Sequence, residues 1–274
     1  MIPRIIHYCW FGGGKMPHSQ RKLIRRWRKL HPDFKIIRWD ESNFDIDFCP
    51  YVREAYKNKK WAFVADVARL FALSTHGGIY MDTDVEVIQP LDRFLCNKAF
   101  SGIEIYQEEF ERDGRPLLDV DNRPIVEGTM IPCCGILSAV IGCEPENPLI
   151  VDCLNEYMTR KPYNDSGTFN SVVIDGILAN NAVKYGFRYE DTEQRLPVIT
   201  IYKSYLFSYC AGERNASSVT YHHSVWSWKP QNTKQRLLLW IDKNVIDPRV
   251  FKSALIHLKS ILSRFHTIVF RRER

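Results

Sequence analysis

The chain has 274 residues, of which 45% are hydrophobic and 13% aromatic, and it carries a formal net charge of +6. This length and composition predict a globular protein with a sizeable core, and no stretch reaches the ~20 continuous apolar residues that a membrane-spanning helix needs. The whole charge excess lies in residues 249–274, so the balanced remainder argues against a nucleic-acid-binding protein.

The first part of the chain alternates between short apolar strands and longer helices. Strands are expected at 2–8, 34–39, 79–81 and 85–88, and helices at 19–30 and 61–75. Such alternation predicts an α/β domain, in which a mostly parallel central sheet is flanked by helices. Ligands bind such sheets at the carboxyl ends of the strands. The first residues show no basic segment followed by a long apolar one, so we expect no signal peptide and a cytoplasmic protein.

The second part begins with a highly charged stretch, 107–128, that contains Gly114, Pro116 and Pro124. We expect an inserted hairpin or flap there, because such excursions often carry specificity or act as lids. A core strand is expected at 135–142, helices at 148–158 and 169–180, and β-rich segments at 198–208 and 219–223. The eight cysteines form no Cys-x-x-Cys pair, which favours buried thiols over a zinc site.

The C-terminal segment has a pattern of its own. After Pro248, apolar residues recur at spacings of three and four, with basic residues mainly between them. This pattern predicts an amphipathic helix. We therefore divide the chain into a main domain, 1–246, and a basic helical tail, 247–274. The tail either packs on the domain or docks on an anionic membrane, and its concentrated charge favours the membrane.

Asp82-Thr83-Asp84 is the central chemical motif. The two aspartates follow an apolar strand and a Gly-Gly pair, and Val85 and Val87 continue the extended pattern. Carboxylates at i and i+2 of a strand point to the same side. At a strand end, both can reach one divalent cation, which in turn can neutralise a diphosphate leaving group. The alternative interpretation, a solvated surface turn, would not need this apolar framing.

Two further groups of residues accompany the motif. Asp66 and Arg69 share one face of an otherwise apolar helix, where they form either a structural ion pair or part of a polar site. We favour the site, because this helix leads directly into the aspartates. Two histidines and two tryptophans fall within 221–228, where they could complete a metal site or form a buried aromatic cluster.

Together these blocks resemble a known family. Residues 2–13 (IPRIIHYCWFGG), Ala65–Arg69 with 77–84 (GGIYMDTD), and the block from His222 to Trp228 look like the signatures of glycosyltransferase family 32. That family includes bacterial capsular and lipopolysaccharide sugar transferases and yeast mannosyltransferases, and the clostridial glucosylating toxin domains are related to it. The resemblance implies a GT-A fold, a divalent cation (commonly Mn²⁺, or Mg²⁺) and retention of anomeric configuration.

The resemblance also implies roles for individual residues at the metal. Asp84 would be the direct metal ligand, and Asp82 would bind ribose and sugar hydroxyls and help to place the metal. His222 would complete the metal site, with His223 as the alternative.

At the donor, Asp66 and Arg69 would contact the sugar and, with the two aspartates, make up the catalytic set. The residues expected around the donor are His7, Trp10, Phe11, Gly12, Asp66, Arg69, Tyr80, Asp82, Ser227 and Trp228. Among them, Trp10 would stack on the nucleotide base, and Ser227 and Trp228 would bind the diphosphate.

The resemblance therefore implies a retaining hexosyltransferase. It would use a nucleotide-sugar donor, with UDP-hexose favoured over GDP-mannose, and a glycan or lipid-linked oligosaccharide acceptor. We expect it to act in surface polysaccharide biosynthesis, on the inner face of the cytoplasmic membrane. Two other classes stay open, a metal-dependent nucleotidyltransferase and a non-catalytic nucleotide- or glycan-binding protein. The first needs a wider spacing between glycines and aspartates than this chain has.

Overall fold

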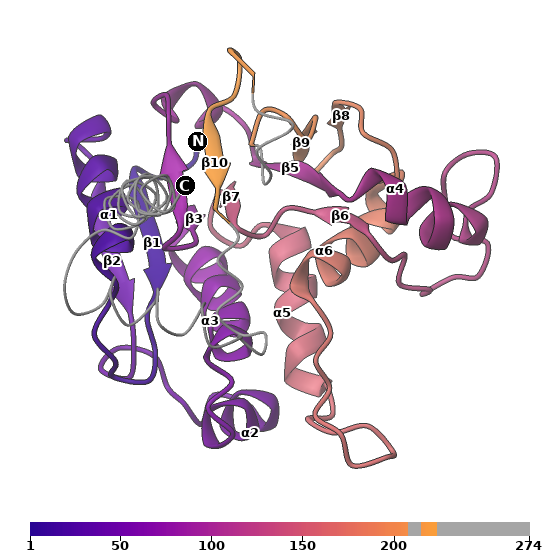
Figure 1. Cartoon of the computed structure of the whole chain (residues 1–274), viewed down its shortest axis with the longest axis horizontal. Helices are drawn as coiled ribbons and strands as arrows, with labels where there is room; N and C mark the ends of the chain where they lie inside the picture. Colours follow the sequence, from indigo (N-terminus) through magenta and orange to yellow (C-terminus); the bar gives the residue numbers. More distant parts are fainter. Residues whose placement is uncertain (208–214, 224–274) are drawn as a thin grey trace, which may run out of the picture. The chain divides into compact units, whose positions relative to one another are not determined.

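The computed structural model describes residues 1–207 and 215–223 (Figure 1). Two compact units can be distinguished. The described residues of the larger one are 1–14, 23–207 and 215–223, and those of the smaller one are 15–22. The sheet and the residues discussed below belong to the larger unit. None of the helices in the described part of the chain is long and apolar enough to cross a membrane.

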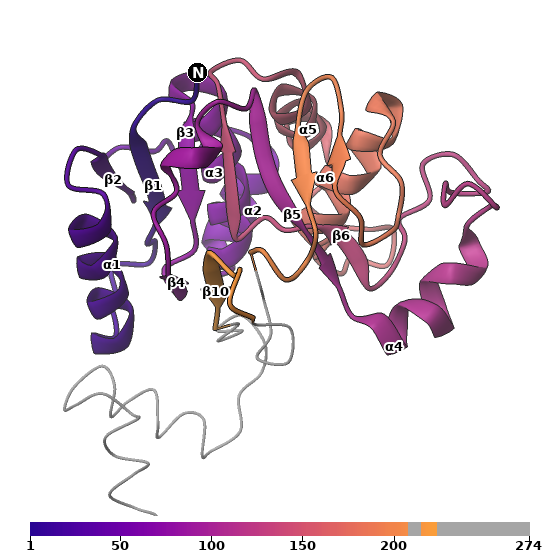
Figure 2. The same cartoon turned by 90° about the horizontal axis from the view of Figure 1, so that it is seen from above.

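An eight-stranded sheet forms the centre of the larger unit (Figure 2). Its order is β2 (Lys35–Trp39), β1 (Ile5–Cys9), β3 (Gly78–Met81), β7 (Val140–Cys143), β5 (Ala99–Ile105), β9 (Thr200–Tyr202) and β8 (Gln194–Arg195), with β6 (Cys134–Ile136) paired to β5. Strand β1 is parallel to β2 and β3, and β5 is parallel to β9. Because β7 is antiparallel to both β3 and β5, five strands of the sheet run in one direction. The predicted α/β class with a largely parallel sheet is confirmed.

Helices cover both faces of the sheet, as expected. Successive side chains of β1 point to opposite faces of the sheet. On one face, the Cys9 thiol lies 3.9 Å from the Ala65 carbonyl of α3 (Trp61–His76). The Tyr8 ring points the other way and meets Trp27 of α1 (His18–Leu30) edge-on at 6.1 Å. On the same side of the sheet as α3 lie α2 (Pro50–Lys57), α5 (Pro148–Thr159) and α6 (Ile174–Ala182) (Figure 1).

The link between α3 and β3 depends on two glycines. Gly77 has φ +61° and its N–H donates to the Leu73 carbonyl, which ends the helix. Gly78 has φ +97°, and a Cβ there would lie 2.7 Å from the Ile5 carbonyl oxygen of β1. Only glycine tolerates this backbone and this approach. The predicted helix end is therefore also the point where β3 joins the sheet.

The segment 135–142 differs from its prediction as one strand. It forms the end of β6, a turn at 137–139 and the start of β7. The Ser101 hydroxyl lies 2.6 Å from the Leu137 carbonyl and 2.9 Å from that of Val140, so it ties the turn to β5. The predicted helix 169–180 begins later, at Ile174. Helix α2 and strand β5 were not among the predicted elements.

The charged stretch 107–128 is an excursion between the antiparallel strands β5 and β6. It begins with helical turns, namely α4 (Gln107–Glu109), a π turn (Phe110–Gly114) and a 3₁₀ turn (Arg115–Leu117). Phe110 is fully buried, and the Asn122 carbonyl accepts the Tyr189 N–H at 2.9 Å. The excursion is thus fixed at two points. The expected tail, 247–274, lies outside the described residues, and the domain boundary stays a prediction.

The core includes an aromatic stack on one face of the sheet. Phe100 lies 5.1 Å from Phe94 and 5.6 Å from Phe207, measured between ring centroids. Gly142 of β7 is the register partner of Phe100. A Cβ added to Gly142 would lie 2.3 Å from a carbon of that ring. Most described thiols are buried, as predicted, but Cys96 is exposed.

We expect Gly142→Ala to lower the free energy of unfolding by about 1–3 kcal/mol, because the stacked Phe100 ring cannot withdraw without disturbing its neighbours. Urea denaturation measures the change. Gly14→Ala is the matched control, since an added Cβ there meets no atom within 4 Å, and it should shift stability by less than about 0.5 kcal/mol. Equal stability of the two variants would contradict this account of the stack.

Candidate active site

The two aspartates lie on a turn at the carboxyl end of β3. All four residues of β3 are buried, and the strand ends where the Asp82 N–H donates to the Ala139 carbonyl at 2.9 Å. The Val85 N–H then donates to the Asp82 carbonyl at 3.0 Å, which closes a turn through Thr83 and Asp84. The expectation of one continuous extended strand is therefore wrong. The chain changes direction here, and the turn brings the carboxylates together.

After the turn, β4 (Val85–Val87) leaves the main sheet and pairs with β10 (Thr220–His222). The antiparallel register places His222 opposite Val85. The next residue, His223, donates its N–H to the Asp84 carbonyl at 3.1 Å. The pairing of β4 with β10 therefore places a histidine from the far end of the described chain next to the aspartate motif.

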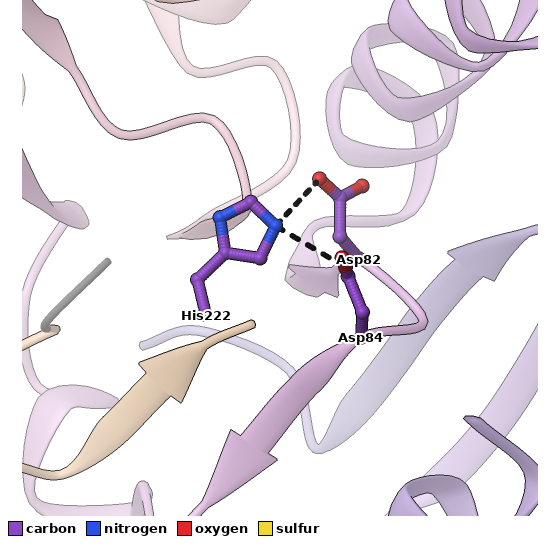
Figure 3. Close-up of side chains that lie close together, drawn as sticks. All are labelled: Asp82, Asp84 and His222. Atoms are coloured by element: carbon purple, nitrogen blue, oxygen red, sulfur yellow. Dashed lines mark hydrogen bonds and ion pairs between the residues drawn. The ribbon is translucent and has the colours of Figure 1, made fainter. Parts of the chain in front are cut away.

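The result is a cluster of three ligand-type side chains (Figure 3). His222 Nε2 lies 3.2 Å from Asp84 Oδ1 and 4.0 Å from Asp82 Oδ2. One ligand atom from each residue falls within 4.8 Å of the others, and within 1–207 and 215–223 this is the one group of three such residues. Two carboxylate oxygens and an imidazole nitrogen suit Mn²⁺ or Mg²⁺ better than a soft metal. The donor set thus fits the expected divalent cation.

The electrostatics of His222 agree with a cation site. Burial alone would lower the pKa of His222, but the carboxylates of Asp84 and Asp82 outweigh it and raise the pKa above its ordinary value. A proton on the imidazole therefore offsets part of the negative charge of the two carboxylates. A metal ion bound at the cluster would replace this proton and offset the same charge. His223 faces elsewhere, with Nε2 3.3 Å from Glu86. Between the two histidines, the geometry favours His222 as the ligand.

Two residues in the second half of α1, both in the larger unit, support the small sheet. Trp27, which is fully buried, donates its indole N–H to the Val85 carbonyl at 2.9 Å. Arg26 donates from Nε to the Val87 carbonyl at 2.7 Å. These bonds occupy backbone acceptors of β4 and hold the strand that follows Asp84. The basic helix was predicted, but nothing in its pattern marked these two residues.

Asp66 and Arg69 form the second part of the site. Both are buried, with exposed fractions of 6% and 5%. Arg69 Nη2 lies 3.0 Å from Asp66 Oδ1 and 3.4 Å from Asp82 Oδ1. The structural ion pair and the ligand-facing role are thus not alternatives, because the same guanidinium pairs within α3 and touches the aspartate motif.

The remaining contacts of Arg69 fix its plane. Nη1 donates to the Ser138 carbonyl at 2.9 Å, and the guanidinium carbon lies 4.4 Å from the centroid of the Tyr80 ring. Tyr80 donates its hydroxyl proton to Asp82 Oδ1 at 2.9 Å. Tyr80, expected at the donor, is 1% exposed, so its nearest role is to hold Asp82 and Arg69.

The Asp66 carboxyl is strongly perturbed. Burial raises its pKa to about 7, against the opposing effect of Arg69, and Asp175 and Asp82 add repulsion. Arg69 is shared with Asp82 and so does not fully compensate Asp66. A carboxyl group that titrates near neutrality beside a metal-type cluster is typical of a functional site.

The N-terminal residues expected at the donor have different surroundings. His7 is fully buried, donates from Nε2 to the Gly77 carbonyl and accepts from the Trp39 indole at Nδ1. Burial lowers its pKa to about 4, so it stays neutral. Both ring nitrogens of His7 are used inside the core, which assigns it to supporting β1 and the glycine turn and corrects its expected role at the donor.

Contacts at Gly12 and Phe11 hold the loop after β1 in place, while Trp10 in the same loop stays partly exposed to solvent. Gly12 has φ +86° and donates its N–H to Glu41 at 2.6 Å, while a Cβ there would lie 2.5 Å from the Trp61 indole. Phe11 is buried against Phe44. Trp10 is half-buried, with its indole N–H donated to the Gly14 carbonyl at 2.6 Å. Base stacking by Trp10 stays a prediction.

Ser227 and Trp228, expected on the diphosphate, lie outside the described residues. The structure adds two acidic residues that sequence reasoning missed. Glu104 of β5 interacts electrostatically with Asp175 of α6 and with Asp82. Asp175 in turn interacts electrostatically with Asp66 and Arg69. Burial and Asp175 raise the pKa of Glu104 well above its usual range. No local motif surrounds either residue, so only the fold reveals them.

Comparison with known proteins places this geometry in context. Residues 17–101 match the family model described as a glycosyltransferase sugar-binding region containing a DXD motif. This region is just under a third of the chain and includes Asp66, Arg69, Asp82 and Asp84, but not His222.

Relatives match over a similar stretch. A mannosyl phosphorylinositol ceramide synthase of Saccharomyces cerevisiae is 33% identical over 104 residues, covering 36% of this chain and 27% of its own. An uncharacterised glycosyltransferase of Acanthamoeba polyphaga mimivirus is 40% identical over 101 residues, covering 35% and 40%. An inositol phosphoceramide mannosyltransferase of Schizosaccharomyces pombe is 35% identical over 103 residues, covering 36% and 29%. The chain thus spans less than half the length of these curated relatives.

Solved structures align over more of the chain but at low similarity. A galactosyltransferase in complex with donor and acceptor sugar analogues shows a TM-score of 0.42 and 11% identity, covering 80% of this chain and 87% of its own. The PaToxG glycosyltransferase shows a TM-score of 0.43 and 15% identity, covering 67% and 69%.

We expect Mn²⁺ to bind at this cluster, with Asp84→Ala and His222→Ala each weakening affinity at least tenfold, since removing a ligand should cost no less than disturbing its outer partners. Calorimetric titration measures the affinity. Affinity should also fall as the pH is lowered from about 8 to 6, because protons compete for His222, whose pKa is raised.

Glu86→Ala and His223→Ala are the matched controls, because they remove the neighbouring carboxylate–histidine pair and leave the cluster intact. Both should retain the wild-type affinity within about twofold, far below the effect of losing a ligand. If His223→Ala were the damaging histidine variant, the assignment of His222 would be wrong.

Proposed function

We propose that this chain is a metal-dependent glycosyltransferase that moves a hexose from a nucleotide-sugar donor to a glycan or lipid-linked acceptor. The observation that carries the proposal is the convergence of Asp82, Asp84 and His222 at the end of β3, with Arg69 alongside. The aspartates and Arg69 fall within the region that matches the sugar-binding family model. The α/β architecture with the motif at a strand end is the one expected of a GT-A fold.

In this proposal the cluster holds Mn²⁺ or Mg²⁺ through Asp84, His222 and Asp82. The cation would neutralise the diphosphate as it leaves. Asp66 and Arg69 contact the donor sugar, and their burial makes each hydrogen bond they offer stronger than it would be in water. Trp10 stacks on the nucleotide base.

We further propose a reaction with retention of anomeric configuration. The bond between the anomeric carbon and the phosphate oxygen breaks, and the acceptor oxygen bonds the same face of that carbon. The acceptor proton passes to the leaving diphosphate. In this reaction the protein orients the reacting groups and stabilises the charge that develops on them. Arg69 is already fixed by Asp66, Asp82 and Ser138, so it needs no rearrangement during the reaction.

The identity of the sugar is a finer proposal. The names of the yeast and fission-yeast relatives describe mannose transfer to inositol phosphoceramide, which supports a mannose donor and a lipid acceptor beside the UDP-hexose favoured from the sequence. A role in surface polysaccharide biosynthesis of the bacterial type gains no support from these fungal relatives. We therefore propose GDP-mannose and UDP-hexoses as the donors to test first.

We expect the protein with Mn²⁺ to release free nucleoside diphosphate from UDP-glucose, UDP-galactose or GDP-mannose, and chelation of the metal to abolish the release. Asp84→Ala should lose at least about 100-fold in turnover, whereas Glu86→Ala should keep wild-type turnover. Release of pyrophosphate from nucleoside triphosphates would instead indicate a nucleotidyltransferase. Binding of a nucleotide sugar without turnover would indicate a binding protein.

We also propose that the tail attaches the enzyme to the inner face of the cytoplasmic membrane. Residues 249–274 contain seven basic residues and one acidic residue, and each basic residue near an anionic surface contributes about 1 kcal/mol. Apolar burial together with these contacts gives reversible, peripheral binding rather than insertion. Such attachment would raise the local concentration of a lipid-linked acceptor.

The full chain should cosediment with vesicles that contain phosphatidylglycerol at low salt and be released at high salt, because surface charge is screened. A form that ends at Asn244 should stay in the supernatant. Replacing Arg271, Arg272 and Arg274 with alanine is expected to weaken binding without removing the apolar stripe. If the full chain also stayed in the supernatant at low salt, the tail would have another role.

A further inference from the structure

The turn between β6 and β7 connects three parts of the candidate site. The Ala139 carbonyl accepts the Asp82 N–H at 2.9 Å. The Ser138 carbonyl accepts from Arg69 Nη1 at 2.9 Å. On its other side, the Ser138 N–H donates to Asp175 Oδ1 at 2.7 Å. One residue of this turn, Ser138, therefore joins a carboxylate at the start of α6 to the guanidinium of α3.

Asp175 is itself held from several directions. It is the second residue of α6, where a negative charge is favoured by the helix N-terminus. Glu104 of β5 interacts with it electrostatically and accepts the Tyr106 hydroxyl at 3.2 Å. A Cβ on Gly135 would lie 2.8 Å from the Asp175 carbonyl oxygen, so glycine permits this close approach of α6 to β6. The backbone that carries this carboxylate is therefore packed closely against β6.

The polar contacts of Arg69 all involve its two terminal nitrogens. Its Nε finds no hydrogen-bond partner among the described residues, although the side chain is 5% exposed. Nη2 is shared between Asp66 and Asp82. Nη1 is oriented by the Ser138 carbonyl. The direction of that carbonyl consequently influences which way the guanidinium plane faces.

We propose that Asp175 is a positioning residue for Arg69, which acts by holding the Ser138 N–H and thereby aiming the Ser138 carbonyl at the guanidinium. The inference rests on the proposed function of the site for its effect on turnover, but its structural step does not. Asp175 needs to touch neither donor nor acceptor in this role. What it must supply is a hydrogen-bond acceptor at Oδ1, not a negative charge.

This distinction makes two substitutions informative. Asp175→Asn keeps a side-chain oxygen that can accept the Ser138 N–H, whereas Asp175→Ala removes it. We expect Asp175→Ala to lower the kcat of donor hydrolysis about tenfold or more, with a smaller change in KM, because a displaced Arg69 misplaces charge at the reacting centre. Asp175→Asn should stay within about threefold of the wild-type kcat. Asp152→Ala, which removes an α5 carboxylate that accepts the Tyr185 hydroxyl, is the control and should leave kcat unchanged.

A double-mutant cycle shows whether the effect passes through Arg69. In an Arg69→Ala background, Asp175→Ala should add less than about a threefold loss, since the group that it positions is already absent. If Asp175→Asn were as damaging as Asp175→Ala, or if Asp175→Ala had its full effect in the Arg69→Ala background, the carboxylate would act directly and the inference would be overturned. A wild-type kcat for Asp175→Ala would overturn it too.

A separate readout distinguishes failure of this inference from failure of the proposed function. Amide hydrogen exchange at Ser138, followed by NMR, should be slow in the wild type and in Asp175→Asn and at least about tenfold faster in Asp175→Ala. The Arg69 side-chain N–H resonances should shift in Asp175→Ala alone. These results would support the inference even if no donor were turned over. Unchanged exchange and unchanged Arg69 resonances in Asp175→Ala would overturn it even in an active enzyme.

Discussion

A single buried cation organises the candidate site. The Arg69 guanidinium lies in the interior, and its charge is compensated by Asp66 on its own helix and Asp82 at the end of β3. An unpaired charge in this position would be strongly destabilising. Helix α3 and strand β3 must therefore meet at one fixed point, and the glycine pair at 77–78 makes the short connection between them possible. The position of the site is thus determined by the ion pairs of Arg69 as well as by packing.

The cluster of Asp82, Asp84 and His222 depends on a second constraint, which is the change of chain direction after β3. Because Asp82 closes a turn with Val85, β4 cannot continue in the main sheet and instead pairs with β10. That pairing brings His222 to Asp84 across 138 positions of sequence. Trp27, from a helix near the N-terminus, holds the carbonyl of Val85. Three distant parts of the chain therefore meet around a motif of three residues.

Some residues of the recognised motifs have supporting roles. His7 uses both ring nitrogens inside the core, and the Gly12 N–H is bonded to Glu41. Conversely, Ser138 contacts Arg69 through its backbone carbonyl, and the Asp175 carboxylate accepts the Ser138 N–H, yet neither residue has a motif around it. A short sequence motif therefore marks the neighbourhood of a site better than it separates residues that contact a ligand from residues that hold those contacts in place.

The sequence by itself determined the α/β class, the helix that carries Asp66 and Arg69, and the strand end that carries the aspartates. These follow from local periodicity and from glycine, which act over a few residues. Only the tertiary structure decided that the aspartates meet through a turn, that His222 rather than His223 approaches them, and that segment 135–142 is two strands. Each of these outcomes depends on strand pairing between distant segments, whose energy comes from partners that no local pattern specifies.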